Sequence, residues 1–149
     1  MAILRALALQ HGYCSADAWV QYESDYVFEV YNDFFHKDEL LAPFFKGTEA
    51  TDEMRTASLE LLCKFFDKLE SRFSDGRIHA AGDQITAADF QLLATECSLI
   101  NNPNGKVPAF NQALGEELNK RTNLVRVINQ LKGENGLTEY IASQPSSSI

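Results

Sequence analysis

The strongest constraint on the fold is a helix start between residues 82 and 90, where the chain reads Gly-Asp-Gln-Ile-Thr-Ala-Ala-Asp-Phe. Thr86 is placed as the N-cap, with its hydroxyl accepting the backbone N–H of Asp89, while the Asp89 carboxylate can reach back to the N–H of Thr86. Ile85 and Phe90 stand at the two positions of a hydrophobic staple. The segment therefore predicts a helix that begins at Thr86, with Asp89 placing negative charge at the positive end of its dipole.

Helical periodicity runs through most of the chain, and no convincing alternating strand appears. Ser15 is expected to cap the second helix. Pro43 and Gly47 are expected in a loop, and residues 144–149 in a flexible tail. The expected helices cover residues 1–11, 15–37, 52–73, 86–100, 108–118 and 124–131, with a short last turn near 137–141. These segments predict an all-α bundle of about six helices, forming one domain over residues 1–143.

Charge and composition exclude several classes of function. With 13 Lys and Arg against 21 Asp and Glu, the formal net charge is −8, which argues against binding to nucleic acid or anionic lipid. No stretch is long enough to insert into a membrane. The cysteines form no C-x-x-C pair and the histidines have no i, i+4 partner, so no metal site is expected. These residues are Cys14, Cys63, Cys97, His11, His36 and His79.

Three stretches resemble cytosolic glutathione transferases in chain order: residues 2–8 with Gly12 and Tyr13, residues 82–90, and residues 123–126 with 136–143. The stretch over residues 2–13 is similar to the last helix of the family's thioredoxin-like half. Residues 82–90 resemble the motif that opens the buried central helix of the C-terminal domain, and the stretches after residue 122 resemble the last two helices. The resemblance implies the C-terminal helical domain of this family, with residues 1–12 as one helix of the thioredoxin-like half.

The same resemblance implies little of a glutathione site in this sequence. In the family, most of that site lies in the thioredoxin-like half, and Met1 falls one residue after the Ser that holds the γ-glutamyl end of glutathione. No catalytic residue is therefore expected here, and no cofactor unless a partner supplies the rest of the site. Asp25 lands where several members have an Asp that reaches glutathione in the neighbouring subunit and could accept its ammonium. A solvated helix acid explains Asp25 equally well.

Aromatic residues cover more than one face of the predicted helix over residues 15–37. Helical spacing of this kind is typical of a core. In glutathione transferases the equivalent helix lines the pocket for the hydrophobic co-substrate, so the resemblance also implies a remnant of that pocket or a protein-binding face. The candidates are Trp19, Tyr22, Tyr26 and Tyr31.

Two hypotheses for function stay open. In the first, the chain is a non-catalytic protein-interaction or structural subunit, as the resemblance implies from related domains in elongation-factor and aminoacyl-tRNA synthetase assemblies. A protein partner would then cover the surface left by the thioredoxin-like half, and a homodimer is also compatible. In the alternative, the chain is a truncated glutathione transferase that conjugates glutathione to electrophiles with a hydroxyl from another chain. The expected compartment is the cytoplasm, with a mitochondrial location open because the first sixteen residues carry Arg5 and no acid.

Overall fold

The computed structural model describes residues 2–102, 104–134 and 136–143. Over these residues the chain forms α-helices and no β-strand, which confirms the predicted all-α class. The predicted tail, residues 144–149, lies outside this part of the chain. The elements are α1 (Ala2–His11), α2 (Ala18–Phe35), α3 (Asp38–Lys46), the 3-10 turn η1 (Gly47–Glu49), α4 (Asp52–Arg72), α5 (Ala87–Thr95), the π turn η2 (Glu96–Ile100), α6 (Pro108–Asn119), α7 (Thr122–Lys132) and α8 (Leu137–Ser143).

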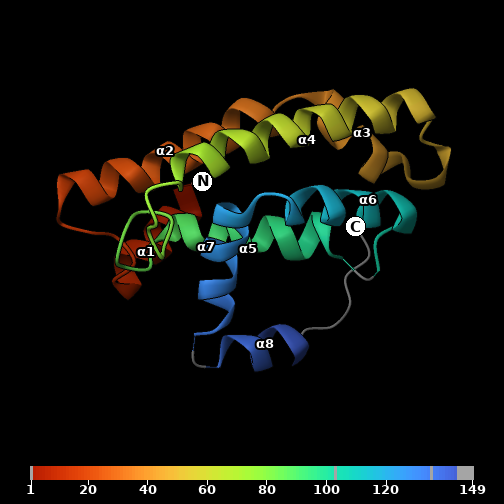
Figure 1. Cartoon of the computed structure of the whole chain (residues 1–149). Helices are drawn as coiled ribbons and strands as arrows, with labels where there is room; N and C mark the ends of the chain where they lie inside the picture. Colours follow the sequence, from red (N-terminus) through yellow and green to blue (C-terminus); the bar gives the residue numbers. More distant parts are fainter. Residues whose placement is uncertain (1, 103, 135, 144–149) are drawn as a thin grey trace.

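The two longest helices, α2 and α4, run side by side, and α5 lies beneath them (Figure 1). α5 contacts α1, α2 and α7, so it is the central helix of the bundle. Large buried side chains from α2 to α7 form one core, in which burying each Leu or Phe contributes about 1.5–3 kcal/mol. They include Val27, Val30, Leu40, Leu62, Phe65, Phe66, Leu69, Leu92, Leu114, Leu124 and Leu131. No helix in the described ranges is both long and apolar enough to cross a membrane.

The N-terminus of α5 carries the capping box that the sequence predicts. The N–H of Thr86 donates to one oxygen of the Asp89 carboxylate at 2.8 Å, and the Thr86 hydroxyl donates to the same oxygen at 3.1 Å. The other oxygen accepts the N–H of Ala80 at 2.8 Å, so Asp89 also holds the loop before the helix. Ile85 and Phe90 both pack against the core. The staple contact between these two side chains stays a prediction.

The start of α2 differs from the prediction. Ser15 does not cap the helix; Asp17 does, because its carboxylate accepts the N–H groups of Trp19 and Val20 at 2.7 and 3.2 Å. The Ser15 hydroxyl oxygen instead accepts the N–H of Asp17 at 3.1 Å. Both residue types are good N-caps, so spacing alone did not separate them.

The loop expected around Pro43 is wrong, because Pro43 lies inside α3. A proline in a helix interior removes one backbone hydrogen bond and is normally costly. Here Leu40 and Phe44 are buried, and the hydroxyl of Ser58 on α4 donates to the Leu40 carbonyl at 2.6 Å. Packing onto α4 thus outweighs the local penalty. Gly47 ends α3 at a φ of 58°, a conformation that favours glycine. With α3 and α8 the described chain has eight α-helices, more than the expected six.

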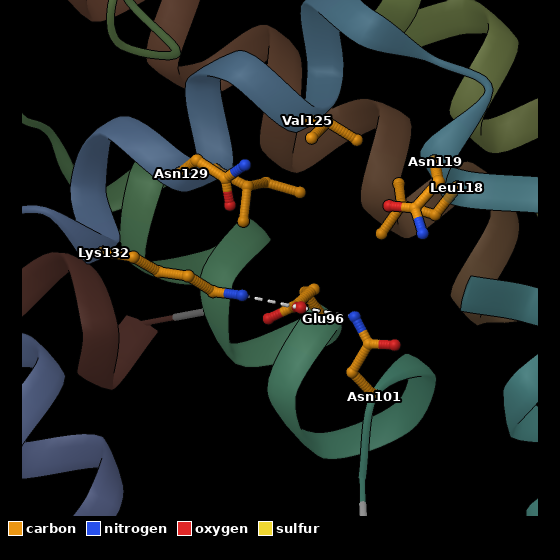
Figure 2. A pocket seen from close by; sticks show the side chains of 8 residues that line it. Glu96, Asn101, Leu118, Asn119, Val125, Asn129 and Lys132 are labelled. Carbon is orange, nitrogen blue, oxygen red and sulfur yellow. Dashed lines mark hydrogen bonds and ion pairs between the residues drawn. The ribbon is translucent and has the colours of Figure 1, made fainter. Parts of the chain in front are cut away.

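The helix predicted to run from Thr86 to Ile100 changes character at Glu96. From there the backbone forms η2, in which the N–H of Asn101 donates to the Glu96 carbonyl at 2.8 Å. The Glu96 side chain is buried and accepts a hydrogen bond from Lys132 of α7 at 2.7 Å (Figure 2). π turns are rare, and those that occur are frequently found at functional sites.

Candidate interaction surface

α1 is apolar on nearly every side. Its inner side packs Leu4 and Ala8 into a small cluster with residues of α2 and α5. Its outer side leaves Ile3 and Leu9 mostly exposed, at 78% and 71%, and Leu7 about half exposed. A helix that is hydrophobic all round is normally buried. The outer side of α1 therefore offers a surface suited to a covering layer of protein.

An apolar groove of about 200 Å³ opens beside this exposed side, between the end of α1 and the start of α5. Its walls are almost entirely aliphatic or aromatic, a lining that favours an apolar side chain over a charged group. The lining residues are Leu4, Leu7, Ala8, His11, Tyr13, Ala87 and Phe90. The outer side of α1 together with this groove is called the α1 face below.

The groove is shaped by the way α1 ends. Gly12 has a φ of 81°, which lets the chain turn so that the N–H of Tyr13 donates to the Ala8 carbonyl at 2.8 Å. The Tyr13 carbonyl accepts the N–H of Ala87 at 3.2 Å, which satisfies an otherwise unpaired donor in the first turn of α5. The Tyr13 ring meets Phe90 edge-on, with ring centroids 4.8 Å apart. The exit of α1 is thereby fixed to the boxed start of α5.

Asp25, the candidate glutathione-binding residue, lies on α2 next to α1. Its carboxylate accepts a hydrogen bond from Arg5 at 2.6 Å. The Arg5 guanidinium also lies 5.6 Å from the centre of the Phe28 ring. Asp25 therefore helps to hold α1 on α2, and glutathione binding by it stays untested.

The four aromatic candidates on α2 fall into two groups. Trp19, 74% exposed, and Tyr22 are at the surface and form an edge-on pair with ring centroids 5.7 Å apart. Tyr26 is half-buried under the Arg72 guanidinium, 4.8 Å from its ring centre. Tyr31 packs against the core, stacked on Phe35 at 4.0 Å, and burial raises its pKa. None of the four lines the groove of the α1 face.

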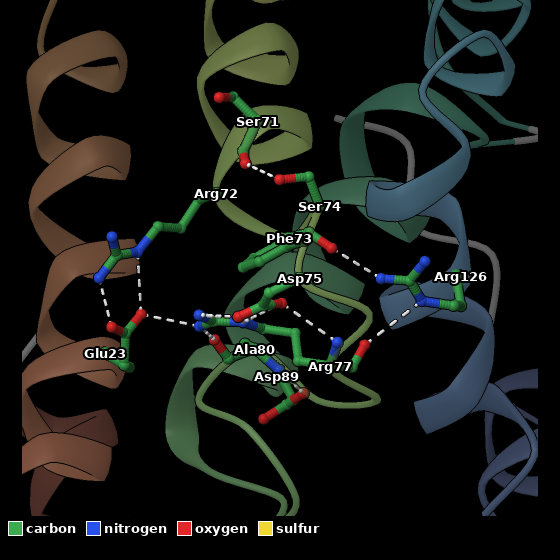
Figure 3. Close-up of polar contacts among 10 residues, drawn as sticks. All are labelled: Glu23, Ser71, Arg72, Phe73, Ser74, Asp75, Arg77, Ala80, Asp89 and Arg126. Carbon is green, nitrogen blue, oxygen red and sulfur yellow. Dashed lines mark hydrogen bonds and ion pairs between the residues drawn. The ribbon is translucent and has the colours of Figure 1, made fainter.

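A cluster of charges that the sequence pattern does not reveal joins α2 to α4 and to the loop before α5 (Figure 3). Glu23 accepts hydrogen bonds from Arg72 and from Arg77, the latter at 2.7 Å. Arg77 also binds Asp75 at 2.7 Å and the Ala80 carbonyl at 3.1 Å. Glu23 lies 49 or more residues from Arg72 and Arg77 in the sequence, so no local pattern indicates these hydrogen bonds. Hydrogen bonds from Arg77 lower the pKa of Asp75 to about 2.

Metal and thiol chemistry receive little support from the geometry. Among the residues that the structure describes, no three His, Cys, Asp or Glu side chains are grouped so that they could hold a metal ion. Burial and the neighbouring Glu96 carboxylate raise the pKa of Cys97 to about 11. Burial also raises the pKa of Cys63. Both thiols are therefore protonated at neutral pH, which makes them poor nucleophiles.

Comparison with known protein families finds a match. A family described as glutathione S-transferase, C-terminal domain, matches residues 32–144, which is most of the chain. No curated protein and no solved structure matches the chain significantly. The matched range holds the end of α2 and the elements from α3 to α8, whereas α1 and the exposed pair Trp19 and Tyr22 precede it.

Proposed function

The chain belongs to the glutathione S-transferase C-terminal domain family, and we propose that it acts as a non-catalytic protein-interaction domain. In this proposal the α1 face is the docking surface, and a protein partner covers it. The bundle of α2 to α7 supplies the rigid support, because α1 is fixed to α2 through Arg5 and to α5 through Tyr13.

The observation that carries this proposal is the exposure of Ile3, Leu7 and Leu9 beside an apolar groove. Burying one such side chain under a partner contributes about 1.5–3 kcal/mol. Several such side chains must be buried together to offset the free-energy cost of association. The surroundings also fit, because residues 1–16 carry no acid in a chain of net charge −8. An acidic partner surface would therefore meet its least repulsion at the α1 face.

Family membership also supports the alternative, a glutathione transferase whose thiolate-stabilising group comes from another chain. Asp25 is the residue that this chain would contribute. Asp25 alone would hold only one end of glutathione, and its carboxylate also holds α1 on α2 through Arg5. We therefore favour the interaction domain. Retention on glutathione-agarose together with turnover of an electrophile would reverse this preference.

The interaction proposal predicts the effect of charging the α1 face. The double variant Ile3→Asp, Leu7→Asp is expected to weaken partner binding at least about 100-fold, because it removes two anchoring side chains at roughly tenfold each and adds charges that repel an acidic partner. Binding would be measured by isothermal titration, using a partner first isolated from a native extract with the whole chain as bait. Both positions are exposed, so the melting temperature should change little.

Phe45→Asp is the matched control, because Phe45 is 71% exposed on α3 at the other end of the molecule (Figure 1). This control should bind the partner as tightly as the unchanged chain. Equal affinity of the double variant and the control would contradict the α1 face as the docking surface. Light scattering on the purified chain would show whether the partner is a second copy.

A further inference from the structure

A second, polar pocket lies away from the α1 face, between η2, the end of α6 and α7 (Figure 2). Its volume of about 150 Å³ is room for roughly five water molecules. Side chains with opposite charges and three carboxamides line it, together with the apolar side chains of α6 and α7. They are Glu96, Asn101, Leu118, Asn119, Val125, Ile128, Asn129 and Lys132.

The floor of this pocket is a built charge pair. The Glu96 side chain, only 5% exposed, accepts hydrogen bonds from Lys132 at 2.7 Å and from the Asn101 amide at 2.5 Å. Its other carboxylate oxygen accepts the Cys97 thiol at 3.2 Å. Burial acts to raise the pKa of Glu96, and these hydrogen bonds more than offset it, so the pKa is lowered. The carboxylate is therefore ionised at neutral pH.

The backbone around the pocket makes room for these groups. The π turn places Glu96 and Asn101 on the same side, at the two ends of one backbone hydrogen bond. Gly115 of α6 faces Asn101, and a Cβ at Gly115 would lie 2.8 Å from the Asn101 amide oxygen. A side chain at position 115 would thus displace the amide that holds Glu96. At the rim, Asn119 and Asn129 are exposed and offer both donors and acceptors.

The charges of the pocket select among small ligands. An anion alone that binds Lys132 would be repelled by the Glu96 carboxylate, which lies 2.7 Å from the Lys132 ammonium. A cation alone would compete with Lys132 for Glu96. Adding a net charge beside a buried pair is costly, whereas a ligand with both charges can match both partners. From this geometry we infer that the pocket binds the head group of a free α-amino acid, with its ammonium toward Glu96 and its carboxylate toward Lys132. The volume fits glycine or alanine, which have five or six non-hydrogen atoms.

The test is a titration of the ¹⁵N-labelled chain followed by NMR, with glycine and alanine as probes. Saturable shifts of the Asn119 and Asn129 side-chain amides are expected, with a dissociation constant of about 1 mM, the range that such small ligands reach. Acetate and methylammonium, each carrying one of the two charges, are expected to bind at least about tenfold more weakly. Equal binding of either, or no saturable shift with glycine and alanine, would overturn the inference.

Amino-acid substitutions test whether the ligand binds in this pocket. Lys132→Met should weaken glycine binding at least about tenfold, because a hydrogen-bonded charge is lost. Lys120→Met, which removes a lysine outside the pocket, should bind glycine as the unchanged chain does. If Lys132→Met fails to fold, Asn129→Leu tests the rim with little risk to the core, because Asn129 is exposed. Unchanged affinity in whichever of these two pocket variants folds would place the ligand elsewhere and contradict the inference.

Discussion

Replacing Asp89 with alanine is expected to lower the free energy of unfolding by about 3–5 kcal/mol. The carboxylate is buried and accepts hydrogen bonds from the N–H groups of Thr86 and Ala80, both at 2.8 Å, and from the Thr86 hydroxyl. Alanine would leave these donors buried without an acceptor, and each unsatisfied donor costs about 1–3 kcal/mol. His79 lies behind them, with its Nδ1 atom 3.6 Å from the carboxylate. Because a domain of this size has only about 5–15 kcal/mol of stability, the variant should be partly unfolded at 37 °C.

The measurement is urea denaturation followed by circular dichroism at 222 nm. Asp83→Ala is the matched control, because Asp83 lies in the loop just before α5 and is exposed, and it should change the free energy of unfolding by less than about 0.5 kcal/mol. Asp89→Asn should fall between the two, since one carboxamide oxygen can still accept. Similar unfolding midpoints for Asp89→Ala and Asp83→Ala would show that the box does not hold the helix start.

This helix start was predictable because its signals are local. Thr86 and Asp89 stand three residues apart, and the geometry of a first helical turn brings any such pair together. The start of α4 at Asp52 is likewise local, since Thr51 accepts the N–H of Met54 at 3.3 Å. The all-α class followed from the same periodicity. The second bond of Asp89, to the N–H of Ala80, depends on a loop shape that the sequence did not predict.

Apart from the choice between Ser15 and Asp17 as the cap of α2, the errors arose where tertiary contacts outweigh local preference. Pro43 indicated a loop, yet the burial of Leu40 and Phe44 against α4 keeps α3 helical around it. No local sequence signal indicates the π turn at Glu96 either. The Glu96 carboxylate is satisfied by Lys132, which lies 36 residues away in the sequence. Of the surface candidates, Trp19 is exposed, whereas helical spacing favoured a core position, and the groove of the α1 face was not predicted. That groove forms only when two segments more than 70 residues apart in the sequence come together, as shown by the rings of Tyr13 and Phe90, whose centroids are 4.8 Å apart.

The Glu23 cluster supplies the second large effect, and it depends on pH. Glu23 is 17% exposed and is held by Arg72 and Arg77 at once. Burial acts to raise the pKa of Glu23, and the hydrogen bonds from the two arginines more than offset it, so the pKa lies below the ordinary value of 4.5. A carboxyl whose pKa is lowered by folding stabilises the folded state above its unfolded pKa, and this stabilisation is lost as the pH falls through the folded pKa.

Glu23→Gln is therefore expected to lower the free energy of unfolding by about 2 kcal/mol at pH 7, because the charge-assisted bonding to two arginines is lost, at about 1 kcal/mol net for each arginine. The difference from the unchanged chain should stay constant between about pH 6 and 8 and begin to shrink below about pH 4.5, where the carboxyl of the unfolded chain becomes protonated. It should disappear as the pH falls through the lower pKa of Glu23 in the folded chain. Urea denaturation at a series of pH values measures it. Glu29→Gln, at an exposed position of the same helix, should show a small difference at every pH. If the Glu23→Gln difference does not change with pH, the two arginines contribute through packing alone, because a charge-dependent contribution must disappear when the carboxyl is protonated.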